Sequence, residues 1–66
     1  MDRLKEFRRE KGLSQEAMAK ILGITLSMYE KVEQGRANAS AGFMKRFKEA
    51  FKEASIDYIF FASQQQ

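Results

Sequence analysis

The chain contains no cysteine and no histidine among its 66 residues. Without cysteine it has no disulfide bridge, no thiolate metal ligand and no cysteine nucleophile. Without histidine it lacks the commonest general base and metal ligand. Its acidic residues are spread along the expected helices, and no pair of them forms an acid–base arrangement. We therefore expect no enzymatic activity, no bound metal and no cofactor.

Long apolar runs are also missing, since no stretch approaches the roughly 18 to 20 residues that cross a bilayer. The first six residues, MDRLKE, are charged where a signal peptide would be apolar. We expect a cytoplasmic protein with no membrane partner. Lysine and arginine number 12 against 9 aspartate and glutamate residues, a net charge of +3. This mild excess permits a polyanionic partner without requiring one.

The absence of proline and the scarcity of β-branched runs favour helices along the whole chain. Apolar residues recur at helical spacing in five segments. These predicted helices cover residues 2–11, 15–22, 26–34, 41–53 and 56–61. We expect each to be capped by a short polar side chain at its start. The expected caps are Asp2, Ser14, Thr25, Ser40 and Ser55.

Only Gly23, Ile24 and Thr25 separate the second and third predicted helices. The apolar residues on both sides can close a small core between two nearly perpendicular helices, as in a helix-turn-helix. The stretches GLSQEAMA (12–19), LGIT (22–25) and YEKVEQG (29–35) resemble the phage repressor and Cro family, also called XRE-type regulators. The resemblance extends over about residues 3–61.

The resemblance implies an all-α, five-helix, lambda-repressor-like DNA-binding domain. This domain covers residues 1–62, with the helix-turn-helix at about 15–34, and residues 63–66 form a frayed tail. In this family the amino-terminal part of the third helix contacts base edges in the major groove. The matching residues here are Leu26, Ser27, Met28, Glu30 and Lys31. Met28 fits a core position equally well, and Leu26 fits an ordinary exposed apolar residue.

The resemblance also implies contacts to the DNA backbone. The matching residues are Ser14, Gln15, Thr25, Gln34, Arg36 and Asn38. Arg8 and Glu33 match an ion pair that joins the first helix to the end of the third. We expect the remaining basic residues, Arg46 among them, to lie on solvated faces. In the recognition segment Glu30 and Glu33 balance Lys31 and Arg36. Tight binding therefore requires a dimer.

The resemblance implies a sequence-specific regulator of transcription that binds double-stranded DNA. We expect a repressor that acts as a homodimer on a palindromic operator. The aromatic carboxyl-terminal residues Tyr58, Phe60 and Phe61 are the candidate dimer interface, although Phe60 also suits the monomer core. The same aromatic cluster supports an alternative, an antitoxin-like or anti-repressor module that binds a protein partner and also binds DNA.

Overall fold

The computed structural model describes residues 1–61, which form five helices and no strand. The helices are α1 (Asp2–Glu10), α2 (Gln15–Leu22), α3 (Leu26–Glu33), α4 (Ala41–Ala50) and the short π-helical segment η1 (Asp57–Phe61). The predicted all-α, five-helix fold is confirmed. Residue 62 and the tail predicted for residues 63–66 lie outside the described residues.

Hydroxyl side chains fix where the three central helices begin. The Oγ atoms of Ser14 and Ser40 and the Oγ1 of Thr25 each accept a hydrogen bond from a first-turn backbone N–H, at 3.0 to 3.1 Å. These caps are those predicted, because they satisfy amides that have no partner within the helix. The cap predicted at Asp2 is wrong. Met1 occupies the cap position without a side-chain bond, and Asp2 lies in the first turn.

Helix α4 ends earlier than the predicted range 41–53. Phe51 leaves helical geometry, with φ −130° and ψ 80°, and its side chain is 9% exposed. The turn also places the Lys48 ammonium within 2.8 Å of the Lys52 carbonyl and 2.6 Å of the Ala54 carbonyl. Burial of the Phe51 ring and the two hydrogen bonds from Lys48 therefore compensate for the helical hydrogen bonds that are lost where α4 ends.

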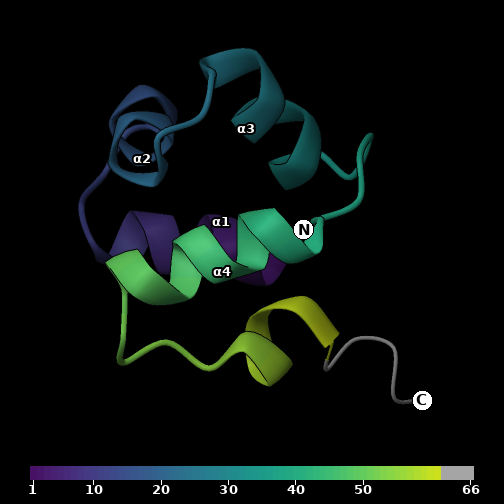
Figure 1. Ribbon diagram of the computed structural model, residues 1–66. Coiled ribbons are helices and arrows are strands. Elements are labelled where there is room, and N and C mark those ends of the chain that lie inside the picture. The colour runs from purple at the N-terminus through teal and green to yellow at the C-terminus, as the bar shows by residue number, and fades with distance from the viewer. Residues whose placement is uncertain (62–66) are drawn as a thin grey trace.

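The helices are arranged in successive levels (Figure 1). Helices α2 and α3 lie at the top of the view, α1 and α4 cross its middle, and η1 lies at the bottom. Helix α1 contacts both α3 and η1, and α2 contacts both α3 and α4. The helix-turn-helix and the carboxyl-terminal helix are thus on opposite sides of the core.

An aromatic cluster joins α4 to η1 across the core. Phe60 meets Phe43 and Phe47 edge to face, with ring centroids 6.0 and 5.4 Å apart. Phe60 is only 4% exposed. The prediction that Phe60 belongs to the dimer interface is therefore wrong, because its ring packs in the core of the monomer. Tyr58 and Phe61 point outward, with 56% and 37% exposure.

Candidate nucleic-acid interface

The turn between α2 and α3 is tight because Gly23 adopts a left-handed conformation, with φ +72°. The backbone N–H groups of Gly23 and Ile24 donate to the carbonyls of Lys20 and Ala19, both at 3.1 Å. These bonds satisfy carbonyls at the end of α2. The small Ala19 side chain is 2% exposed and lies in the core. The sequence thus sets a short, closed connection that holds α3 against α2.

Arg46 of α4 supports this turn from outside the motif. Its Nη1 donates to the Leu22 carbonyl at 3.1 Å and to the Gly23 carbonyl at 3.4 Å. Arg46 is exposed, as expected for a residue on a solvated face, and its guanidinium also holds the turn. No sequence pattern marks this contact, because an arginine on a helix surface is ordinary and its partners are backbone atoms far along the chain.

Helix α3 has a buried face and an exposed face. Tyr29 and Val32 are 0% and 1% exposed and fix the inner face in the core. The predicted base-contacting residues lie on the rest of the surface. Leu26, Ser27, Met28 and Lys31 are exposed, whereas Glu30 is half-buried. The side chains at the start of α3 are therefore available to a ligand without any change in packing.

The carboxylate of Glu33 is the centre of a buried hydrogen-bond network. Arg8 donates to it from Nε at 2.9 Å and from Nη2 at 3.1 Å. The Tyr29 hydroxyl donates at 2.5 Å, and the Gln15 amide donates at 3.0 Å. A further Arg8 nitrogen, Nη1, donates to the Leu13 carbonyl at 2.8 Å. The pair expected between Arg8 and Glu33 is present in the structure, and the network joins α1, α2 and α3.

Burial alone would raise the pKa of Glu33, which is 5% exposed. The hydrogen bonds from Arg8, Tyr29 and Gln15 outweigh burial and hold this pKa below its ordinary value of 4.5. Burial, together with the hydrogen bond to Glu33, raises the pKa of the Tyr29 phenol well above 10. The carboxylate therefore stays charged and the phenol stays a donor throughout the neutral range.

This network changes the charge that α3 presents. The predicted neutrality assumed four charges at the surface, those of Glu30, Glu33, Lys31 and Arg36. Glu33 is instead buried and paired with Arg8. Lys31 and Arg36 remain exposed, while Glu30 is half-buried. The expectation of a neutral recognition surface is therefore corrected. The charge that remains favours an anion, which the phosphate backbone supplies.

The predicted backbone-contacting residues fall into two groups. Ser14, Gln15 and Thr25 lie at the amino-terminal ends of α2 and α3, where helix dipoles favour phosphate. Gln34, Arg36 and Asn38 are exposed in the segment that follows α3. Gln15 differs from the other residues of the first group, because its Nε2 already donates to Glu33. It therefore connects the surface at the start of α2 with the buried network.

No helix within residues 1–61 is long and apolar enough to cross a membrane. In the same part of the chain, no group of three or more acidic side chains is placed to hold a metal ion. The exposed start of α3, at the helix-turn-helix, is the candidate site.

A known family matches nearly all of this structure. The family model HTH_3, described as helix-turn-helix, matches residues 4–59, from the first turn of α1 into η1. No curated protein and no solved structure matches the chain. The match includes the turn at Gly23, the outer face of α3 and the Arg8–Glu33 pair within one unit.

Proposed function

The chain belongs to the helix-turn-helix family, whose members are DNA-binding regulators of transcription, and we propose that it is a homodimeric repressor of a palindromic operator. The observation that carries this proposal is the outer face of α3. Leu26, Ser27, Met28 and Lys31 are exposed there, while Tyr29 and Val32 hold the opposite face in the core. An α-helix with such a face fits the major groove, which is about 12 Å wide.

In the proposed complex, contacts to the backbone set the position of the protein on DNA. The hydroxyl and amide groups at the starts of α2 and α3, with Gln34, Arg36 and Asn38 after α3, contact phosphates. The side chains of α3 then contact base edges, with Ser27 and Lys31 at the centre of the exposed face and Glu30 at its margin. Repression follows from occupancy, because the bound protein blocks the polymerase.

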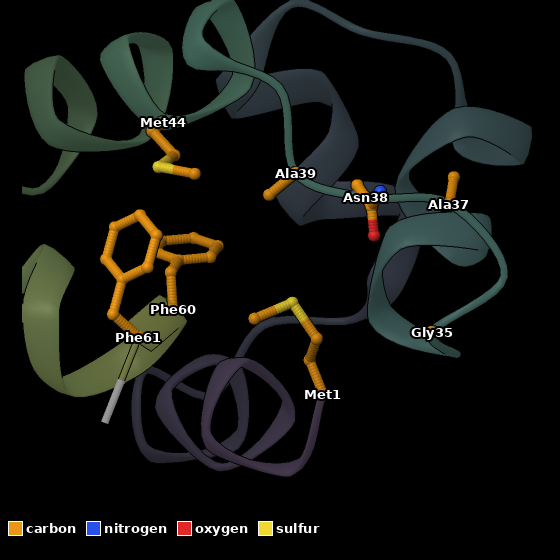
Figure 2. A pocket seen from close by; sticks show the side chains of 8 residues that line it. All are labelled: Met1, Gly35, Ala37, Asn38, Ala39, Met44, Phe60 and Phe61. Atoms are coloured by element: carbon orange, nitrogen blue, oxygen red, sulfur yellow. The ribbon is translucent and has the colours of Figure 1, made fainter. Parts of the chain in front are cut away.

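The dimer is proposed to form through η1 and the segment after α3. A groove of about 370 Å³ lies between these elements. Figure 2 shows Met44, Phe60 and Phe61 on one side of it and Ala39 on the segment opposite. Phe61, which is 37% exposed, supplies aromatic surface in this groove, whereas Tyr58 is exposed on the side of η1 that faces Arg3 of α1. A second copy that covered the groove would remove apolar area from water, which favours association.

The size of the monomer suits this arrangement. Its extents are 32 × 25 × 21 Å. Recognition helices in successive major grooves lie about 34 Å apart, so the proposed dimer has to hold its two α3 helices at that spacing. Each helix alone contacts only a few base pairs, so the palindrome supplies the specificity that one half-site lacks.

Selection of bound sequences from a random duplex library, at near-physiological salt, tests the function. We expect enrichment of a two-fold symmetric site with half-sites about one turn apart. Failure to enrich any sequence contradicts operator binding. Enrichment of a single, non-repeated half-site contradicts the dimer and leaves DNA recognition in place.

A matched pair of variants tests the interface. Phe61→Ser should shift the protein towards monomer in analytical ultracentrifugation and weaken binding to the full palindrome while leaving the helical content unchanged, since Phe61 is 37% exposed. Phe60→Ser should instead unfold the protein, because Phe60 is 4% exposed. If Phe61→Ser and the parent sediment alike as dimers, the interface lies elsewhere.

The groove in Figure 2 also supports the second function, a module that binds a protein partner. An antitoxin-like or anti-repressor protein uses such a surface for another protein and still binds DNA through its helix-turn-helix. Salt dependence separates DNA binding, alone or beside a protein partner, from protein binding without DNA. A regulator that contacts several phosphates should lose affinity for duplex DNA steeply as salt rises. A flat response would favour the protein-binding module.

A further inference from the structure

The first residue of α3 is Leu26, an aliphatic side chain that is 38% exposed. Within residues 1–61 it belongs neither to the core nor to the partly buried side chains packed against the core. It follows Thr25, whose hydroxyl caps the helix at the Met28 amide, so its backbone position is fixed. The fold therefore holds a partly exposed leucine at the start of α3, outside the core cluster.

Met28 differs from Leu26, although it is 46% exposed. Met28 lines a largely apolar pocket of about 340 Å³ together with Ile24, Val32 and Phe43. Its thioether thus has apolar neighbours within the protein. Leu26 does not line this pocket, and the exposed 38% of its surface is available to an apolar group on a ligand.

The major-groove edges of the bases carry hydrogen-bond donors and acceptors, and the one apolar group among them is the 5-methyl group of thymine. Residues in the first turn of a recognition helix meet these edges. We infer that Leu26 contacts a pyrimidine 5-methyl group in each half-site and thereby selects thymine over cytosine there. This inference rests on the proposed function, since it requires α3 to lie in the major groove.

The shared chemistry is the methyl group, which 5-methylcytosine presents at the same ring position as thymine. Base substitutions in the operator obtained from the library selection test thymine and 5-methylcytosine separately. Deoxyuridine in place of thymidine removes the methyl group and keeps the base pairing. A comparison of cytosine with 5-methylcytosine adds the methyl group and changes nothing else.

Binding of the unmodified protein to these duplexes is measured by fluorescence anisotropy. We expect deoxyuridine at one thymine position to weaken binding about fourfold in one half-site and about fifteenfold in both. At that position 5-methylcytosine should bind about fourfold tighter than cytosine. This arm uses the native chain, so it does not depend on whether any variant folds.

The Leu26→Ala variant assigns the contact. It should bind the thymine and uracil operators with equal affinity and remain folded, since Leu26 lies outside the core cluster. Ile21→Ala is the matched control, because Ile21 is 48% exposed on α2 and lines a surface shared with α4. Ile21→Ala should keep the preference for thymine, because Ile21 lies outside the exposed face of α3.

The outcomes distinguish a failure of this inference from a failure of the proposed function. Failure of the selection to yield any operator overturns both. A tight operator at which the native protein binds thymine and uracil alike overturns the role of Leu26 alone. The same conclusion follows if Leu26→Ala keeps the thymine preference, or if 5-methylcytosine binds no tighter than cytosine.

Discussion

Replacement of Glu33 by glutamine should destabilise the protein far more than its small change in shape suggests. Arg8 and Glu33 are 9% and 5% exposed, and the carboxylate accepts hydrogen bonds from Arg8, Tyr29 and Gln15. Glutamine leaves the buried guanidinium without its countercharge. Removal of one partner from a buried ion pair costs about 3–5 kcal/mol. A domain of this size has a free energy of unfolding near the lower end of about 5–15 kcal/mol, so the loss is a large share of it.

Urea denaturation followed by far-ultraviolet circular dichroism measures the effect. With a slope of about 1 kcal/mol/M for a small domain, a loss of about 3 kcal/mol moves the midpoint down by about 3 M. The double variant Arg8→Met with Glu33→Leu is the control, because it removes both charges and should recover part of the stability, less the cost of leaving the buried Tyr29 hydroxyl without its acceptor. A loss below about 1 kcal/mol for Glu33→Gln would refute the argument that the buried charge needs its partner. Failure of the double variant to exceed Glu33→Gln would refute it as well.

The same network sets the response to acid. The pKa of Glu33 in the folded protein lies below its ordinary value of 4.5, so the unfolded state binds the proton more readily. The stabilisation is therefore complete above about pH 4.5 and is lost as the pH falls through the lower, folded pKa. Denaturation midpoints between pH 7 and pH 3 should fall more steeply for the parent than for Glu33→Gln. Parallel curves would show that other carboxylates dominate acid unfolding.

Three further perturbations have distinct expected outcomes. Gly23→Ala should cost more stability than Gly35→Ala, because both positions are left-handed but only at Gly23 would a Cβ, 2.8 Å from Nη1 of Arg46, displace the guanidinium from its hydrogen bond to the Leu22 carbonyl; equal thermal shifts would contradict this. Ser40→Ala should lower the free energy of unfolding by about 1 kcal/mol through loss of the α4 cap, and no change in the urea midpoint would argue against that cap. Because burial raises the pKa of Tyr29, stability should be fully present below pH 10 and fall above it, and Tyr29→Phe should remove that part of the alkaline loss in pH-dependent melting curves.

Local chemistry made the helices predictable. Ser14, Thr25 and Ser40 act within three residues of their own positions, and Gly23 ends α2 through its own backbone angle. Such features are visible in a single sequence because both partners lie in the same short window. The inward positions of Tyr29 and Val32 were predictable for the same reason, from helical spacing.

Contacts between distant segments were not predictable in the same way. The end of α4 depends on the packing of Phe51 in the core, and Arg46 binds carbonyls at the end of α2. Neither contact leaves a periodic pattern, since each depends on where another helix lies. The Arg8–Glu33 pair was expected only through the family resemblance, and the participation of Tyr29 in it is visible only in the structure.

The buried network also bears on how the DNA-facing surface obtains its charge. Glu33 belongs to the same short helix as Lys31, and an exposed carboxylate there would repel the phosphate backbone. Its pairing with Arg8 beneath the surface removes that repulsion and at the same time ties α3 to α1. The two effects cannot be separated by mutation of Glu33 alone, because a variant that frees α3 also changes its charge. The double variant Arg8→Met with Glu33→Leu separates them, since it removes the buried charges while leaving the exposed Lys31 and Arg36 in place. If that variant folds and keeps its affinity for operator DNA, the network acts through stability; if it folds and loses specific binding, the network sets the orientation of α3.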